Sequence, residues 1–142
     1  MKKTILVTAA LGLMIAFGSF KKVKDGTVIT DTYSGNVNVT STGQDPAGDF
    51  TGNNDNGTYS FGWDNPKSRA DVSFDITTPT GSMQMIIEDA DDTEVLNKTR
   101  SAGGNDSFSG LTASGGVSGI WTVTMIFTDF NGDGSYSMSP TN

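Results

Sequence analysis

The side chains with the most distinctive chemistry lie near the C-terminal end, where oxygen-bearing residues alternate along the chain. Asp129, Asn131 and Asp133 occupy every second position, and Gly134 follows them directly. Carboxylate and amide oxygens are the ligands that calcium prefers, and a glycine after the first ligands allows the sharp bend of a calcium loop. The spacing therefore matches the first half of such a loop.

The second half of a calcium loop is missing. The twelfth position, where a bidentate Glu belongs, is Pro140, and the flanking segments alternate like strands rather than helices. Asn131-Gly132 and Asp133-Gly134 are also strong hairpin-turn dipeptides. Two interpretations stay open: a hairpin turn, which the sequence favours, and a weak calcium site completed by other loops.

An acidic run lies in the middle of the chain, and it consists of Glu88, Asp89, Asp91, Asp92 and Glu94. Carboxylates this close together repel one another, so either calcium neutralises them or water screens them. The sequence favours a solvated, exposed turn.

Three aromatic residues alternate with small ones at Tyr59, Phe61 and Trp63. This period of two places all three rings on one face of a strand. If that face is exposed, Tyr59 and Trp63 form a platform on which a sugar ring could stack. Aromatic residues at this spacing are more typical of a core, and the sequence favours that interpretation.

The composition excludes most catalytic chemistry. The chain contains no His and no Cys, so Ser-His-Asp triads, histidine metal sites, thiolate sites and disulfides are impossible. We therefore expect a protein that is not an enzyme. From Asp25 onward only four basic residues stand against all 16 acidic ones, which argues against a nucleic-acid partner because phosphate binding depends on Lys and Arg.

The elements that must position these residues are short strands. Alternation is clear over Val72–Ile76, Met83–Ile87 and Trp121–Phe127, and no long segment after residue 18 has a helical apolar period. Residues 41–57 are predicted to form a long polar loop, and residues 131–134 a hairpin turn. We predict a single all-β domain over residues 27–142, folded as a two-layer antiparallel β-sandwich of about eight or nine strands.

The N-terminal residues predict export. Two lysines precede an apolar run over Thr4–Phe17, and Ala16 and Gly18 have the spacing that a signal peptidase accepts. We predict a signal peptide over residues 1–18, a flexible leader over residues 19–26, and a secreted or cell-surface protein without membrane insertion after cleavage. The alternative is a retained membrane anchor, because the run is close to the minimum of about 17 residues for a bilayer span.

Several segments of the second half match a known pattern. They are Ala70–Phe74, Met83–Glu88 with its Asp-rich turn, Gly119–Val123 and Phe130–Ser137. On these segments, residues 58–139 resemble the small bacterial β-sandwich domains of the pre-peptidase C-terminal type, which are related in shape to jelly-roll, galactose-binding-like folds. The resemblance implies a jelly-roll sandwich with a non-catalytic, extracellular accessory role.

Two functions follow from these observations. The first is a structural or adhesive surface protein that forms homo-oligomers or filaments, or binds the cell envelope or matrix, through β-rich residues 27–40 at a sheet edge. The alternative is an extracellular module that binds a glycan or another small ligand. Calcium is the only cofactor that the sequence suggests.

Overall fold

Within the part of the chain that the structure describes, every regular element is an antiparallel strand. The structure is a computed structural model, and it describes residues 24–103 and 106–142. The predicted signal peptide therefore lies outside the described residues. The seven strands are β1 Val28–Asp31, β2 Asn36–Ser41, β3 Ala47–Asn65, β4 Arg69–Glu88, β5 Glu94–Ser101, β6 Ser107–Leu111 and β7 Gly119–Thr141. The all-β prediction is confirmed.

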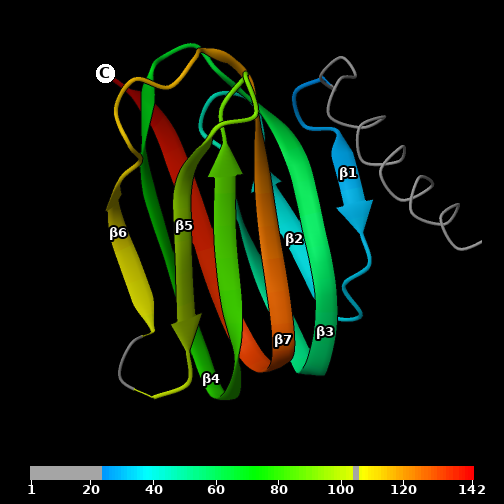
Figure 1. The fold of residues 1–142 in the computed structure, drawn as a ribbon. Helices are drawn as coiled ribbons and strands as arrows, with labels where there is room; N and C mark the ends of the chain where they lie inside the picture. The colour runs from blue at the N-terminus through cyan, green and yellow to red at the C-terminus, as the bar shows by residue number, and fades with distance from the viewer. Residues whose placement is uncertain (1–23, 104–105) are drawn as a thin grey trace, which may run out of the picture.

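The strands form the two layers of a β-sandwich, which we name the front and back layers after the view in Figure 1. The front layer has the order β1, β3, β7, β4, β5, and the back layer has the order β2, β3, β7, β4, β6. The three long strands β3, β4 and β7 occur in both orders because each bends and continues from one layer into the other (Figure 1).

Glycine permits these bends. The pairing register shifts between Asn53 and Gly57 in β3 and between Thr77 and Ser82 in β4, which are the features of a β-bulge. At Gly81 φ is +91°, and a Cβ there would lie 2.1 Å from the carbonyl oxygen of Asp129. Only glycine combines this backbone conformation with such close strand packing.

Two predictions about turns are wrong, and the bends explain both. The segment 131–134 is not a hairpin turn: it lies inside β7, whose two halves belong to different layers and do not pair with each other. The segment 41–57 is not a long loop, because β3 starts at Ala47 and includes the polar residues up to its bend. Continuous bent strands also reduce the number of strands from the expected eight or nine to seven.

The core lies between the two layers and follows the predicted alternation. Trp121, Val123, Met125 and Phe127 are all buried, while the threonines between them face outward. The indole rings of Trp63 and Trp121 pack edge to face with centroids 5.6 Å apart. Burying such large rings supplies much of the stabilisation of a small domain.

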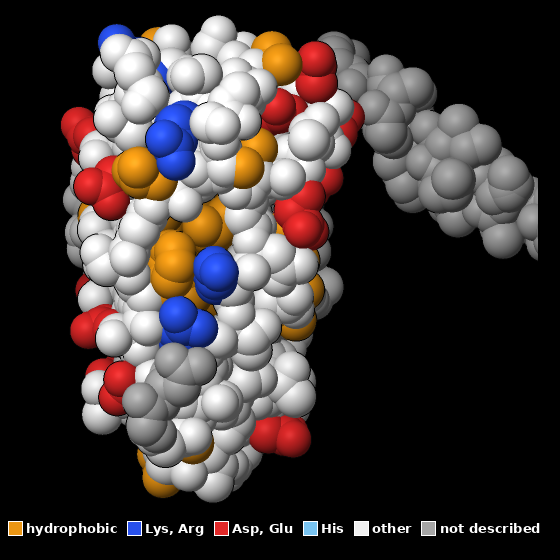
Figure 2. Space-filling view, turned by 60° about the vertical axis from the view of Figure 1, so that its left-hand side comes forward, with side chains coloured by type: hydrophobic (Ala, Val, Ile, Leu, Met, Phe, Trp, Pro, Cys, Tyr) orange, Lys and Arg blue, Asp and Glu red, His pale blue; other side chains and the backbone are white. Residues whose placement is uncertain are grey.

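The sandwich is open along two sides, because its outermost strands do not pair across the layers. At the β5/β6 edge, Lys98 and Arg100 lie opposite the buried Met85 and Met83, so their side chains start on the inner face of the front layer. Both cationic groups lie 5.5 Å from the centre of the Phe108 ring. Figure 2 shows this side of the molecule, where cationic side chains lie beside a strip of hydrophobic ones.

Candidate functional site

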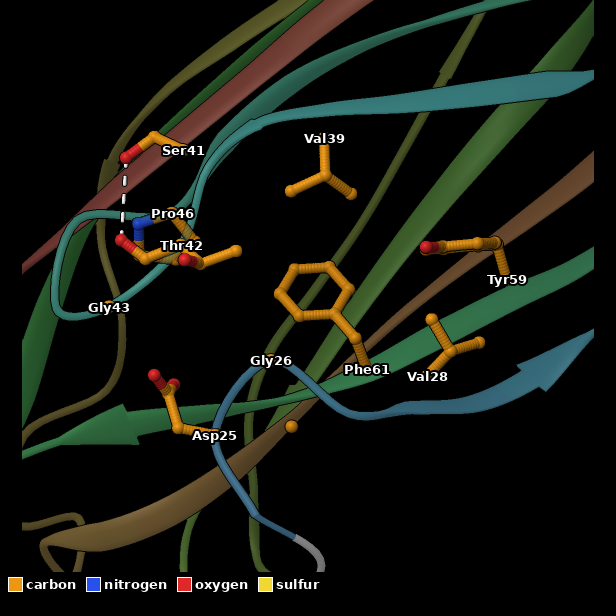
Figure 3. Close-up of a pocket in the computed structure, with 11 residues that line it drawn as sticks. Asp25, Gly26, Val28, Val39, Ser41, Thr42, Gly43, Pro46, Tyr59 and Phe61 are labelled. Atoms are coloured by element: carbon orange, nitrogen blue, oxygen red, sulfur yellow. Dashed lines mark hydrogen bonds between the residues drawn. The ribbon is translucent and has the colours of Figure 1, made fainter.

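The opposite side of the sandwich, the β1/β2 edge, contains a pocket of about 130 Å³. It exists because β1 pairs with the second half of β3 in the front layer while β2 pairs with the first half in the back layer. The two edge strands therefore stand apart and leave a gap between the layers. Figure 3 shows the ring of Phe61 at the centre of this gap, with Val39 facing it from β2 and Val28 beside it from β1.

The walls of the pocket are apolar. Tyr59 and Phe61 are inward-facing residues of β3, and Val28 lies opposite Phe61 in the β1–β3 register. Pro46, in the β2–β3 connection, closes one end. Val28 and Val39 remain 47% and 40% exposed, so the pocket opens to solvent between them.

The rim carries a small number of polar groups, and some are already engaged. One carboxylate oxygen of Asp25 accepts a hydrogen bond from the backbone N–H of Asp64 at 2.7 Å. The Ser41 hydroxyl donates to the carbonyl oxygen of Asp45 at 3.0 Å. Among the described residues, the hydroxyls of Thr42 and Tyr59 have no hydrogen-bond partner. The free groups are therefore two hydroxyls and the second oxygen of Asp25.

The Tyr59 hydroxyl points into the space between Val39 and Phe61 (Figure 3). Burial, and to a smaller extent the charge of Asp31, raise the pKa of Tyr59 above its usual value of 10. The phenol is therefore neutral at physiological pH and can donate a hydrogen bond to a ligand oxygen.

A second tyrosine, Tyr136, packs behind the wall of the pocket, with its ring 6.0 Å from that of Phe61. Its hydroxyl is buried and has no hydrogen-bond partner among the described residues. Burial first, and then Tyr59 and Asp49, raise the pKa of Tyr136 well above its usual value. A buried hydroxyl without a partner is unfavourable by about 1–3 kcal/mol, so this position carries a stability cost next to the pocket.

The structure separates the two residues of the predicted stacking platform. Trp63 is fully buried, and its indole N–H donates to the carbonyl oxygen of Gln44 at 2.9 Å, so it has no exposed face for a sugar. Its role as a platform is therefore corrected to a core role, because the strand face that carries it packs between the layers. Tyr59 is only 7% exposed, and it lines the pocket.

The residues of the predicted calcium loop do not form a loop. Asp129, Asn131 and Asp133 lie at the bend of strand β7, between β3 and β4. Asp129 lies at the bend of β7 with a φ of +46°, and its carboxylate accepts a hydrogen bond from the side-chain amide of Asn56 at 3.1 Å. Within residues 24–103 and 106–142, no three acidic side chains are grouped as a metal site requires. These residues do not fit a calcium loop by themselves, and calcium binding stays a prediction.

The acidic run is only partly a solvated turn. Asp89 is buried, and its carboxylate accepts backbone hydrogen bonds from Asp91, Thr93 and Val117 at 2.9–3.0 Å. The expectation of an exposed turn is therefore wrong for Asp89, whose carboxylate fastens the β4–β5 turn to the segment before β7. The sequence contained a signal for this role, since Asp often accepts hydrogen bonds from the backbone two residues ahead.

A broader hollow crosses the outer face of the back layer. Small polar side chains line it, among them Asp71, Ser73 and Ser137. It is shallow, and the described residues that line it include no aromatic ring, with Ala47 and Met138 as their only apolar side chains. The β1/β2 pocket is the better candidate site.

Sequence reasoning did not find this pocket. Val28, Val39 and Pro46 belong to no motif, and the pocket arises only from the offset between β1 and β2 on the bent strand β3. The one local signal was the inward alternation of Tyr59 and Phe61.

No protein-family model matches this chain, and no curated protein sequence matches it significantly. Solved structures match it in fold. The carbohydrate-binding module TmCBM61, solved in complex with β-1,4-galactotriose, is 14% identical to this chain with a TM-score of 0.51, and the match covers 82% of this chain and 90% of the module.

Two further matches have lower TM-scores. The carbohydrate-binding module CBM6cm-2 from Cellvibrio mixtus lichenase 5A, solved with cellotriose, is 12% identical over 84% of this chain and 100% of the module, with a TM-score of 0.43. The arabinose-bound α-L-arabinofuranosidase MgGH51 is 10% identical over 84% of this chain but only 25% of its own, with a TM-score of 0.41.

The likeness to TmCBM61 shows the fold: this chain is a jelly-roll β-sandwich of the kind found in carbohydrate-binding modules. The jelly-roll fold implied by the resemblance is therefore confirmed. The specific resemblance to pre-peptidase C-terminal domains stays a prediction. In residues 24–103 and 106–142 there is also no helix of the length and hydropathy needed to cross a membrane.

Proposed function

We propose that this protein is a non-catalytic, extracellular carbohydrate-binding module and that the β1/β2 pocket is its binding site. The observation that carries the proposal is the pocket itself: an apolar cavity with the Phe61 ring at its centre, open to solvent, with free hydroxyls of Thr42 and Tyr59 at its margin. Apolar walls with a few directed polar groups are typical of small-ligand sites. A sugar ring offers both an apolar face and hydroxyls to such a site.

The fold supports the same function without assigning it. TmCBM61, which has this fold, was solved with a galactotriose, and CBM6cm-2 was solved with cellotriose. The signal peptide predicted over residues 1–18 supports an extracellular location, where polysaccharides are accessible. The absence of His and Cys from the sequence is consistent with binding rather than catalysis.

The test is a glycan array followed by calorimetry on the purified protein. Val39→Gln extends a longer side chain into the pocket, and we expect affinity for any bound glycan to fall at least about tenfold. Val117→Gln is the matched control, because Val117 is 42% exposed, close to the 40% of Val39, and does not line the pocket. A wild-type protein that binds no glycan, or equal losses in the two variants, would overturn the proposal.

The structural and adhesive function has one observation in its favour. Among the described residues β1 pairs only with β3, so its other side has no strand partner there, and Val28 and Ile29 in β1 are 47% and 43% exposed. Exposed apolar edge strands can accept a strand from another chain. Sedimentation of the wild type and of Ile29→Lys over a range of concentrations tests this candidate, and a wild type that stays monomeric throughout would count against it.

A further inference from the structure

We infer that the β1/β2 pocket selects a neutral sugar that carries a methyl group, either a 6-deoxy sugar or an N-acetyl sugar, over the fully hydroxylated equivalent. This inference rests on the proposed carbohydrate-binding function and specifies its ligand class. Three properties of the pocket carry it: the chemistry of its walls, its supply of hydrogen-bonding groups, and its charge and size.

The walls suit a methyl group better than a hydroxymethyl group. Val28 and Val39 approach from the two edge strands, Pro46 closes one end, and Phe61 lies between them. All four present only carbon atoms to the cavity. A methyl group packed among them is removed from water favourably, whereas a hydroxyl in the same place would lose its hydrogen bonds to water.

The pocket also has too few polar groups for a ring with four or five hydroxyls. The Asp25 carboxylate has one oxygen occupied by the Asp64 N–H, and the Ser41 hydroxyl is already donating to Asp45. Thr42 and Tyr59 remain as donors. Each sugar hydroxyl that enters without a partner weakens binding, so a 6-deoxy ring, which has one hydroxyl fewer, is favoured by this shortage.

Charge and size restrict the ligand further. Asp25 brings a carboxylate to the rim, and no Lys or Arg is among the described residues that line the pocket, so uronic and sulfated sugars are repelled. The volume of about 130 Å³ is well below the ~300 Å³ at which drug-sized ligand pockets begin. The pocket therefore holds one ring or one substituent, which indicates a terminal sugar or a side branch rather than the middle of a chain.

The test compares matched free sugars by NMR titration of the purified protein: D-fucose with D-galactose, L-rhamnose with L-mannose, and N-acetylglucosamine with glucose. We expect the methyl-bearing member of at least one pair to bind about 5- to 100-fold more tightly. The first two pairs report a 6-deoxy methyl group, and the third reports an acetamido methyl group. Galacturonic acid is the anionic probe, and we expect no measurable binding of it.

Val39→Thr keeps the shape of the side chain but places a hydroxyl in the pocket. We expect this variant to lower the preference for the methyl-bearing sugar at least threefold, while Val117→Thr leaves it unchanged. Equal affinity within every pair would overturn the inference and leave the proposed function intact. No binding of any sugar, including those on the array, would overturn both the inference and the proposed function. A preference that persists in Val39→Thr would show that the selectivity does not arise in this pocket.

Discussion

The two open edges of the sandwich differ in the side chains that fill the space between the layers. At the β5/β6 edge, the inward positions of the outer strand hold Lys98 and Arg100, whose cationic groups lie over the ring of Phe108. At the β1/β2 edge, the corresponding space holds Val28, Val39 and the rings of β3, and no Lys or Arg is among the described residues that line it. The β5/β6 edge is therefore covered by cationic side chains, whereas the β1/β2 edge is open and apolar.

This difference supports the β1/β2 edge as the candidate binding edge. Inward-pointing charges on an edge strand protect a sheet from pairing with other chains, because a partner strand would have to bury them. The β5/β6 edge has this protection. An exposed apolar edge favours aggregation unless a ligand or partner covers it. We therefore expect a ligand in the open pocket at the β1/β2 edge.

The largest loss of stability is expected from a change at Asp89, whose carboxylate connects the β4–β5 turn to the segment before β7. Asp89→Asn replaces one carboxylate oxygen with an amide that cannot accept from the Val117 N–H, and we expect unfolding free energy to fall by about 2–3 kcal/mol. Asp25→Asn is the matched change at the β1/β2 edge, where an exposed carboxylate accepts one bond that Asn can also accept. There we expect a loss below about 0.5 kcal/mol. Urea denaturation measures both, and equal losses would contradict this difference.

The alternating segments made the core predictable, but the sequence left the bends and the pocket undetermined. Trp121 to Phe127 could be placed because alternation in a strand depends only on local geometry. Gly132 could not, because Asn-Gly indicates a turn in isolation, and only the neighbouring strands show that it permits a bend. At Gly132 a Cβ would lie 2.0 Å from the carbonyl oxygen of Thr77, which is a non-local constraint.

The same reasoning explains the mixed result for the candidate site. Tyr59 and Phe61 were expected to share a face, and they do. Whether that face meets solvent depends on how far β1 and β2 are offset along β3, which no local pattern records. Trp63, two residues further along, lies fully inside the core for that reason.

High pH should lower the stability of the protein through the buried tyrosines near the β1/β2 edge. Burial, together with the charge of Asp55, raises the pKa of Tyr33 from 10.0 to about 12, and burial raises that of Tyr136 further. The unfolded chain loses these protons first, so the stability present below pH 10 is lost as the pH rises through 12. Each tyrosine contributes at most about 1.4 kcal/mol per pH unit.

Thermal melting followed by circular dichroism from pH 9 to pH 12 measures this loss. The double variant Tyr33→Phe/Tyr136→Phe should lose less stability than the wild type over the same range, because neither ring can ionise. Parallel curves for the two proteins would show that other groups, such as the lysines, control alkaline unfolding.

The two tyrosines should respond in opposite directions at neutral pH. The Tyr33 hydroxyl donates to the carbonyl oxygen of Thr51 at 2.9 Å, so Tyr33→Phe should destabilise the protein by about 1 kcal/mol. The Tyr136 hydroxyl is buried without a partner, so Tyr136→Phe should stabilise it by a similar amount. Each variant serves as the control of the other in denaturant unfolding, and a loss of stability in Tyr136→Phe would mean that its hydroxyl has a bound partner.

The most direct test of the protected edge comes from Lys98→Met combined with Arg100→Met. Methionine keeps an unbranched stem over Phe108, and exposed cation–π contacts contribute about 0.5–1 kcal/mol each, partly replaced by the new apolar packing. Arg100 also donates hydrogen bonds to the carbonyl oxygens of Ser107 and Thr99, so we expect the monomer to lose about 1 kcal/mol of stability. The charges that oppose strand pairing are removed, so the variant should associate at concentrations where the wild type does not.

Sedimentation velocity measures this association. The control is Lys67→Met, a change at an exposed lysine in the β3–β4 connection. A double variant that sediments like the wild type at every concentration would show that the β5/β6 edge is protected by something other than its charges.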